Sequence, residues 1–136
     1  MAEQWDRNAE LAALGKRNLS GPNLINARMW IYHHDLEIQA DTYARAKTYY
    51  ERTKATLMTS LMVADGEGKK LSAAAAEQFA DADPDVWKAA LAYRLAEQMT
   101  GADKEALKIL HSELNAWQTS RADERAADTF TARNGT

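Results

Sequence analysis

The chain has 136 residues, the size of one ordinary domain, and a formal net charge of −3. This charge excludes the strongly basic field that draws many proteins to nucleic acid or anionic lipid. There is no cysteine, which excludes disulfides, thiolate metal sites and cysteine nucleophiles. No apolar run is long enough for a signal peptide core or a membrane span, so we expect a cytoplasmic protein without a membrane partner.

The N-terminal segment predicts a short helix from about Glu3 to Leu14, with Gly15 at the position of a C-terminal cap. The sequence KRNLSGPN that follows is typical of a linker. Its proline, Pro22, suits the first turn of the next helix, where a missing N–H leaves no bond unmade. We therefore expect residues 1–21 to form an N-terminal helix and linker.

Between Pro22 and Ala64 there is no further proline or glycine, and small or apolar residues recur in steps of three and four, with one step of seven. These residues are Leu24, Ala27, Ile31, Ile38, Thr42, Ala46, Tyr49, Thr53, Leu57, Ser60 and Ala64. They predict one helix too long to be buried in a compact domain of this size. We expect an elongated antiparallel hairpin, or a coiled coil with another chain.

The rest of the chain is too short to cover so long an apolar seam, and exposed apolar stripes favour association. We therefore expect a homo-oligomer. The residues expected at or near the contact between copies are Trp30, Ile31 and Ile38.

The chain is expected to reverse at Asp65–Lys70, DGEGKK, because its two glycines permit unusual backbone angles. Ser72 is a good N-cap for the helix that follows. Asp83 and Pro84 form a second cap followed by a first-turn proline, so we expect a break near Asp83.

The last helical segment is expected to run from Pro84 to about Ala126. Its apolar residues predict two stripes: Val86, Leu91, Leu95 and Met99, then Leu107, Leu110, Leu114 and Trp117. Gly101 and a possible new cap at Asp103 leave open whether this is one helix or two. Residues 22–126 then form an all-α hairpin domain resembling a coiled-coil bundle, and residues 127–136 a flexible tail.

Catalytic and metal-binding motifs are not evident. His33 and His34 are adjacent, so on a helix their rings point about 100° apart and do not share a metal ion. The GEGKK segment lacks the spacing of a phosphate-binding loop and follows a helix instead of a strand. We expect no enzymatic activity, metal or cofactor.

A stretch of interleaved bases and tyrosines, YARAKTYYERTK, is the one candidate for nucleic-acid binding. Its candidate contacts are Arg45, Lys47, Tyr50, Arg52 and Lys54. The favoured alternative is structural: residues 42–70 carry an excess of bases and residues 71–136 an excess of acids. In a hairpin the two arms would then pair, with the basic side chains covering apolar surface.

The segments YYERTKATLM, AEQFADADPDVWKAALAYRLAEQ and LKILHSELNAWQTSRADERA resemble small helical proteins of tailed bacteriophages, encoded near recombination and replication genes. The resemblance covers about Tyr49 to Ala126, and WQTSRADERA is its most specific part. It implies a helical hairpin and a phage setting, and it includes no catalytic motif.

The function expected from the sequence is that of a non-enzymatic accessory protein with an unidentified protein partner. Two alternatives stay open: a single-stranded nucleic-acid-binding factor of phage recombination or replication, and a phage inhibitor of a host defence protein.

Overall fold

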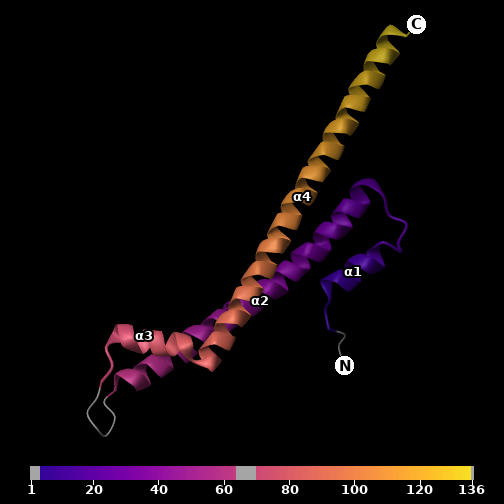
Figure 1. Cartoon of the computed structure of the whole chain (residues 1–136). Coiled ribbons are helices and arrows are strands. Elements are labelled where there is room, and N and C mark those ends of the chain that lie inside the picture. Colours follow the sequence, from indigo (N-terminus) through magenta and orange to yellow (C-terminus); the bar gives the residue numbers. More distant parts are fainter. Residues whose placement is uncertain (1–3, 64–69, 136) are drawn as a thin grey trace. The chain divides into compact units, whose positions relative to one another are not determined.

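The computed structural model describes residues 4–63 and 70–135, and within these ranges it is helical, without a strand. The helices are α1 (Arg7–Leu14), α2 (Gly21–Met62), α3 (Ala73–Ala82) and α4 (Pro84–Asn134) (Figure 1). The prediction of an all-α fold is confirmed. None of the described helices is both long and apolar enough to cross a membrane.

The chain divides into two compact units. The first unit comprises Met1–Leu36 and Ala102–Thr136, and the second comprises Glu37–Gly101. In the first unit the rings of His33 and His111 lie 6.4 Å apart, while a Cβ added at Gly21 would lie 3.5 Å from the indole nitrogen of Trp117. These pairings make α2 and α4 antiparallel, as predicted for a hairpin. The boundaries predicted at residues 21 and 126 both fall within the first unit.

The helix ends follow from their capping residues. Helix α1 begins at Arg7, later than predicted, because the Asp6 carboxylate accepts hydrogen bonds from the amides of Asn8 and Ala9. Ser72 caps α3 as predicted. Asp83 ends α3 and caps α4 by accepting from the amides of Asp85 and Val86, so the predicted break near Asp83 is confirmed.

The reversal predicted at Asp65–Lys70 lies, except for its last residue, outside the described residues. On either side of it, the Leu71 amide donates to the Leu61 carbonyl at 3.4 Å. This bond brings the end of α2 and the approach to α3 together within the second unit.

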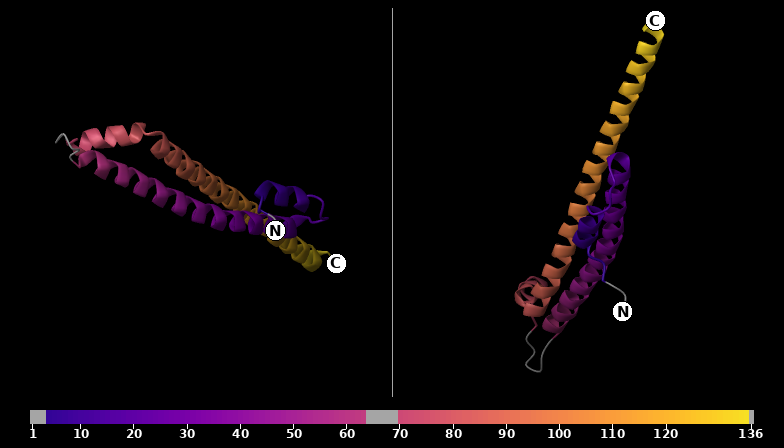
Figure 2. Two further views of the ribbon diagram at one scale, coloured as in Figure 1. Left: turned by 90° about the horizontal axis from the view of Figure 1, so that it is seen from below. Right: turned by 90° about the vertical axis from the view of Figure 1, so that its right-hand side faces the viewer.

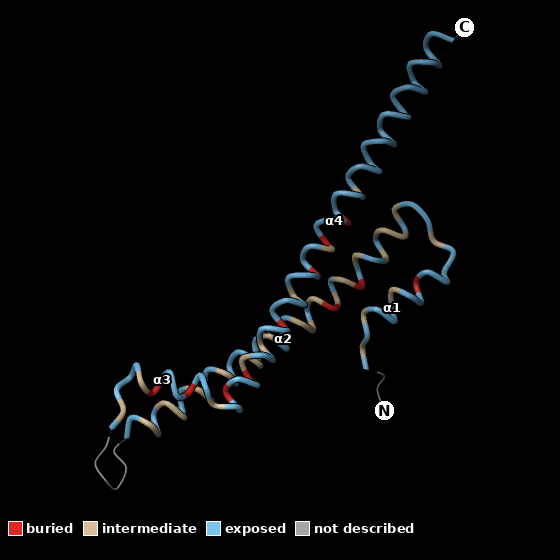
Figure 3. Tube along the Cα trace, in the orientation of Figure 1, coloured by how far each residue is buried: buried red, intermediate tan, exposed pale blue. Residues whose placement is uncertain are grey.

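Helix α4 is continuous through Gly101 and Asp103 and reaches Asn134, so its predicted end near Ala126 was wrong. Gly101 is exposed and has open space around it, which limits its effect to the weak helix propensity of glycine, about 1 kcal/mol. From residue 115 onward every described residue of α4 is exposed (Figure 3). This part of α4 is therefore stabilised by local helix propensity and not by tertiary packing.

The side of α4 that packs differs from the first predicted stripe. Its buried or half-buried residues are Val86, Ala89, Ala90, Tyr93, Ala96, Thr100, Asp103, Ala106, Leu107, Leu110 and Leu114. Apart from Ala90 and Ala106, they follow alternating steps of three and four. The prediction was right for Val86 and for Leu107, Leu110 and Leu114, and wrong for Leu91, Leu95, Met99 and Trp117, which are exposed. Small side chains at Ala89 and Ala96 leave room for the large ring of Tyr93 between them.

In the second unit the packed side of α2 agrees with the prediction at Ile38, Ala46, Thr53 and Leu57, which are half-buried. It is shifted by one residue at the predicted positions Thr42, Tyr49 and Ser60. Tyr43 and Tyr50 are half-buried, whereas Thr42 and Tyr49 are exposed. The Tyr93 ring explains the shift, because its centroid lies 6.3 Å from that of Tyr43 and 4.9 Å from that of Tyr50. Packing three aromatic rings together buries more apolar surface than packing Thr42 and Tyr49 would.

Candidate functional site

Two buried carboxyl groups form the most unusual feature of the first unit. Asp35 on α2 is 2% exposed and Asp103 on α4 is 0% exposed. A buried carboxylate is costly unless it is paired, so the residues around this acidic pair decide its state. The pair was not predicted from the sequence.

The partners of the acidic pair come from the N-terminal arm, which we define as residues 5–14. The Arg7 guanidinium donates to the Asp103 carboxylate at 2.8 Å and lies 3.8 Å from that of Asp35. The Trp5 indole N–H donates to Asp35 at 3.0 Å. One cation and one neutral donor from the arm thus meet two acids from the hairpin.

The environment of Asp103 favours its protonated form. The pKa of Asp103 is raised to about 6. Burial is the largest cause, a hydrogen bond with Asp35 adds to it, and the hydrogen bond from Arg7 opposes both effects. Arg7 has its pKa raised, chiefly by its hydrogen bond to Asp103. Between about pH 4 and pH 6 the acidic pair therefore holds a proton that a solvated aspartate would have released.

Two carboxyls that share a proton are also found in catalytic dyads. Here both carboxyls are shielded from solvent, and the arm supplies donors to each of them. No substrate can reach them while the arm is in place. We interpret the acidic pair as a polar connection between α1, α2 and α4.

The predicted histidine positions take part in ring packing beside this connection. His34 stacks on Trp30 with centroids 5.4 Å apart, and Trp5 meets His34 edge-on at 4.3 Å. His33 instead faces His111 of α4. Across residues 4–63 and 70–135, no group of three or more metal-ligating side chains is close enough to hold a metal ion.

The three residues predicted at a contact between copies have different environments. Ile31 is 5% exposed, so it is already covered within the first unit, and its place at or near a contact between copies stays a prediction. Trp30 is exposed but packs against Trp5 and His34. Ile38 is half-buried in the second unit. They do not form one open apolar surface.

Two of the five candidate nucleic-acid contacts are engaged in packing within the second unit. Tyr50 lies against Tyr93. The Lys54 ammonium lies 3.0 Å from the Asp81 carboxylate and 3.2 Å from that of Glu77, both on α3. The hydrogen bond to Asp81, followed by that to Glu77, raises the pKa of Lys54 above its ordinary value. These contacts agree with the structural alternative, in which the basic side chains pair with acids of the same chain instead of binding nucleic acid.

Lys47 is solvent-exposed and lies over the Tyr43 ring, with its nitrogen 5.8 Å from the ring centroid. The pKa of Lys47 is raised, chiefly by its charge interaction with Tyr43. The stripe that looked continuous in the sequence is therefore occupied by contacts within the second unit along much of its length.

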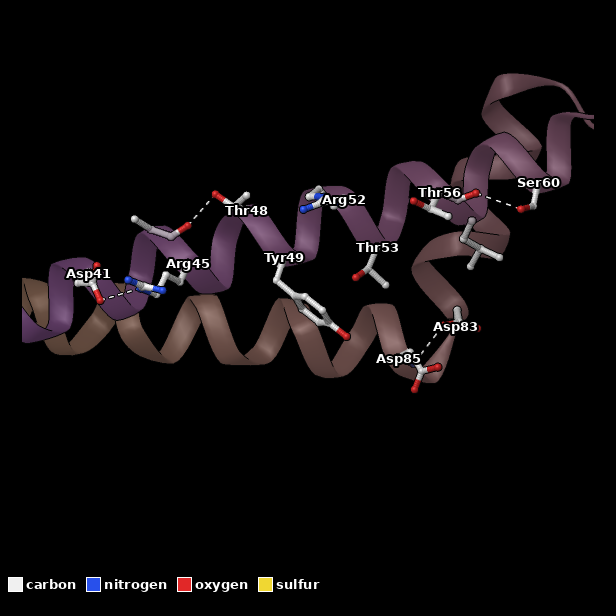
Figure 4. A pocket seen from close by; sticks show the side chains of 12 residues that line it. Asp41, Arg45, Thr48, Tyr49, Arg52, Thr53, Thr56, Ser60, Asp83 and Asp85 are labelled. Carbon is white, nitrogen blue, oxygen red and sulfur yellow. Dashed lines mark hydrogen bonds and ion pairs between the residues drawn. The ribbon is translucent and has the colours of Figure 1, made fainter. Parts of the chain in front are cut away.

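The remaining candidates, Arg45 and Arg52, line an open groove of about 970 Å³ in the second unit (Figure 4). Tyr49 points into the groove between them. The Arg45 guanidinium donates to Asp41 at 2.9 Å. Further acids, Asp83 and Asp85, line the end of the groove nearest α3. The groove thus combines two arginines with three aspartates.

A stripe of large apolar side chains lies open on α4 in the second unit. We call it the α4 stripe: Trp87, Leu91, Leu95 and Met99, with exposed fractions of 43 to 61%. Steps of four place these residues along one side of the helix. This side faces away from the packed side that Ala89, Tyr93 and Ala96 define.

Sequence reasoning missed the acidic pair and its partners for identifiable reasons. Asp103 follows Gly101, which made it look like the cap of a new helix. A usable signal was its position four residues before Leu107, in register with Leu110 and Leu114. No local signal connects Arg7 with Asp103, because 96 positions separate them in the chain.

Comparison with known proteins found no matching family model, no matching curated protein and no matching solved structure.

Proposed function

We propose that this protein is a non-enzymatic helical binding protein that acts through protein–protein contacts and self-association. The observation that supports this proposal is the α4 stripe. Exposed apolar side chains that occur singly are ordinary, whereas a continuous stripe of four large ones is typical of an interaction surface. The resemblance to phage proteins supports a setting in the cytoplasm of an infected host.

The α4 stripe replaces the surface that the sequence predicted for self-association. An apolar stripe along a helix suits a partner helix that presents a similar stripe, since side chains three and four positions apart interlock. A second copy of the chain offers such a helix. In the proposed function the stripe binds another copy, and a different protein presenting a similar helix competes for it.

We expect the wild type to self-associate at micromolar concentration and Leu91→Glu/Leu95→Glu to be monomeric, because two carboxylates placed in an apolar contact cannot be desolvated cheaply. Sedimentation velocity over a concentration series measures the change. The matched control is Val63→Glu/Phe130→Glu, which alters two exposed apolar residues outside the stripe. A wild type that stays monomeric at high micromolar concentration contradicts self-association.

Single-stranded nucleic-acid binding is a second candidate, favoured by Arg45, Tyr49 and Arg52 in the groove. The three aspartates of the groove disfavour a phosphate backbone there, and this imbalance ranks the candidate second.

We expect no submicromolar binding of oligonucleotides, because phosphate contacts in the groove would place negative charge beside these aspartates. Fluorescence anisotropy at 50 and 200 mM salt tests this directly. Tight, salt-sensitive binding that Arg45→Ala/Arg52→Ala abolishes and Lys47→Ala preserves would favour the nucleic-acid candidate instead.

A further inference from the structure

The N-terminal arm is held mainly by polar contacts. Of the residues in α1, only Leu14 is buried. Cavities of about 230 Å³ and 400 Å³ lie on its flanks, the first between Leu14 and Ile31 and the second between Leu11 and Leu110. Figure 2 shows α1 running beside the first part of α2. An element with so little apolar burial belongs to the least stable part of a fold.

The slot between α2 and α4, into which the N-terminal arm binds, favours a segment with particular hydrogen-bond donors. Asp35 and Asp103 lie between α2 and α4 and receive a guanidinium and an indole N–H from outside the hairpin. Without these donors, the two carboxyls lose the cation and the hydrogen bond that compensate for their burial and mutual repulsion. The slot thus selects a cation and a hydrogen-bond donor over a purely apolar segment.

The sequence of the arm meets this requirement compactly. Trp5 and Arg7 are two positions apart, so both reach the acidic pair from one short extended segment. Asp6 between them starts α1, and the helix then places Leu11 and Leu14 over the hairpin. The recognition unit is a Trp-x-Arg segment followed by a short amphipathic helix.

We propose that the slot around Asp35 and Asp103 is a docking site for a Trp-x-Arg helical segment, filled here by the chain's own arm and open to the arm of a second copy. Charge complementarity defines this occupant: two acids meet one guanidinium and one indole N–H. A second copy presents an identical arm. If two copies exchange their arms, each arm makes the same hydrogen bonds and ion pairs in the partner's slot as it makes in its own. The contact uses residues of the first unit, whereas the α4 stripe belongs to the second.

The probe is a labelled synthetic peptide of residues 4–19, added to the full-length protein. The wild-type arm competes with the peptide for the slot. The Arg7→Ala protein holds its own arm less well, so we expect it to bind the peptide at least about tenfold more tightly than the wild type does. A peptide with alanine in place of Trp5 and Arg7 should show no saturable binding to either protein.

Three further variants keep the test decisive. Asp35→Asn/Asp103→Asn, combined with Arg7→Ala, removes the charge of the slot and should weaken peptide binding roughly tenfold or more. If Arg7→Ala loses its helical circular dichroism, Trp5→Ala takes its place, because it removes one neutral hydrogen bond and leaves the cation. Leu91→Glu/Leu95→Glu should leave peptide binding unchanged, which separates this site from the α4 stripe.

The proposal is overturned if the folded arm variant binds the peptide no better than the wild type. It is equally overturned if binding persists unchanged when both aspartates are replaced by asparagine, because the peptide then binds elsewhere.

Discussion

Asp103→Asn is expected to stabilise the protein at pH 8 and to remove part of its dependence on pH. Asp103 is fully buried and its pKa is raised from 3.8 to about 6 in the fold, so at pH 8 the folded protein carries an ionised carboxyl that its surroundings disfavour. Asparagine resembles the protonated carboxyl in shape, and its carbonyl can still accept from Arg7. The asparagine side chain is therefore neutral at every pH, whereas the Asp103 carboxyl is neutral only in acid.

The direction in which the contribution of Asp103 to stability changes with pH follows from proton binding. The folded protein binds the Asp103 proton more tightly than the unfolded chain does, so this contribution is fully present below pH 3.8 and is lost as the pH rises through about 6. The shift corresponds to at most about 3 kcal/mol, of which roughly 1.5 kcal/mol appears between pH 8 and pH 5. This trend is opposite to ordinary acid denaturation.

The measurement is urea denaturation of the wild type and Asp103→Asn at pH 8, 7, 6 and 5. The advantage of the variant in free energy of unfolding should shrink by roughly 1.5 kcal/mol from pH 8 to pH 5. Asp123→Asn, an exposed aspartate on the same helix, controls for charge alone. An advantage that does not change with pH would show that Asp103 does not titrate in this range.

The secondary structure could be predicted because its signals are local. Capping by Ser72 and Asp83, and the lack of glycine and proline after Pro22, determine where α2, α3 and α4 form. The packed side of α4 was harder to predict, because hydrophobicity ranks leucine above alanine. Ala89 and Ala96 are nevertheless buried on the side of Tyr93, whereas Leu91 and Leu95 are exposed.

The acidic pair could not be predicted, because its physical cause is tertiary. Hydrophobicity assigns a polar residue such as Asp103 to the solvent, although its spacing places it in register with Leu107. Its burial is tolerated because Arg7, far away in the sequence, supplies the compensating charge. Likewise, the packing of α3 and α4 against α2 decides which of the candidate nucleic-acid contacts are packed and which line the groove, and the sequence alone does not show this packing. A seam shifted by one residue was enough to exchange the environments of Tyr49 and Tyr50.

Arg7→Ala is expected to cost about 3 kcal/mol in the free energy of unfolding of the first unit at pH 7. Removing one partner of a buried ion pair typically costs 3–5 kcal/mol, because the remaining charge is left uncompensated. Undocking of the N-terminal arm limits the loss here, since water then reaches Asp35 and Asp103. Arg7→Lys should recover only part of it, because a guanidinium donates to Asp103 and Asn8 at once in a fixed planar geometry that an ammonium lacks.

Urea denaturation measures the total loss, and hydrogen exchange of the α1 amides shows whether the arm undocks first. The matched control is Arg121→Ala, which removes an exposed arginine 3.2 Å from Glu124 on α4 and should cost less than about 1 kcal/mol. Equal costs for the two variants would contradict a central role for the acidic pair.

A double-mutant cycle tests the cause of the loss. In the Asp103→Asn background the slot carries one carboxylate fewer, so Arg7→Ala should cost less than it does in the wild type. If the cost is the same in both backgrounds, Arg7 stabilises the arm through its packing on the Tyr32 ring, 5.6 Å from the guanidinium carbon, and not through the acidic pair.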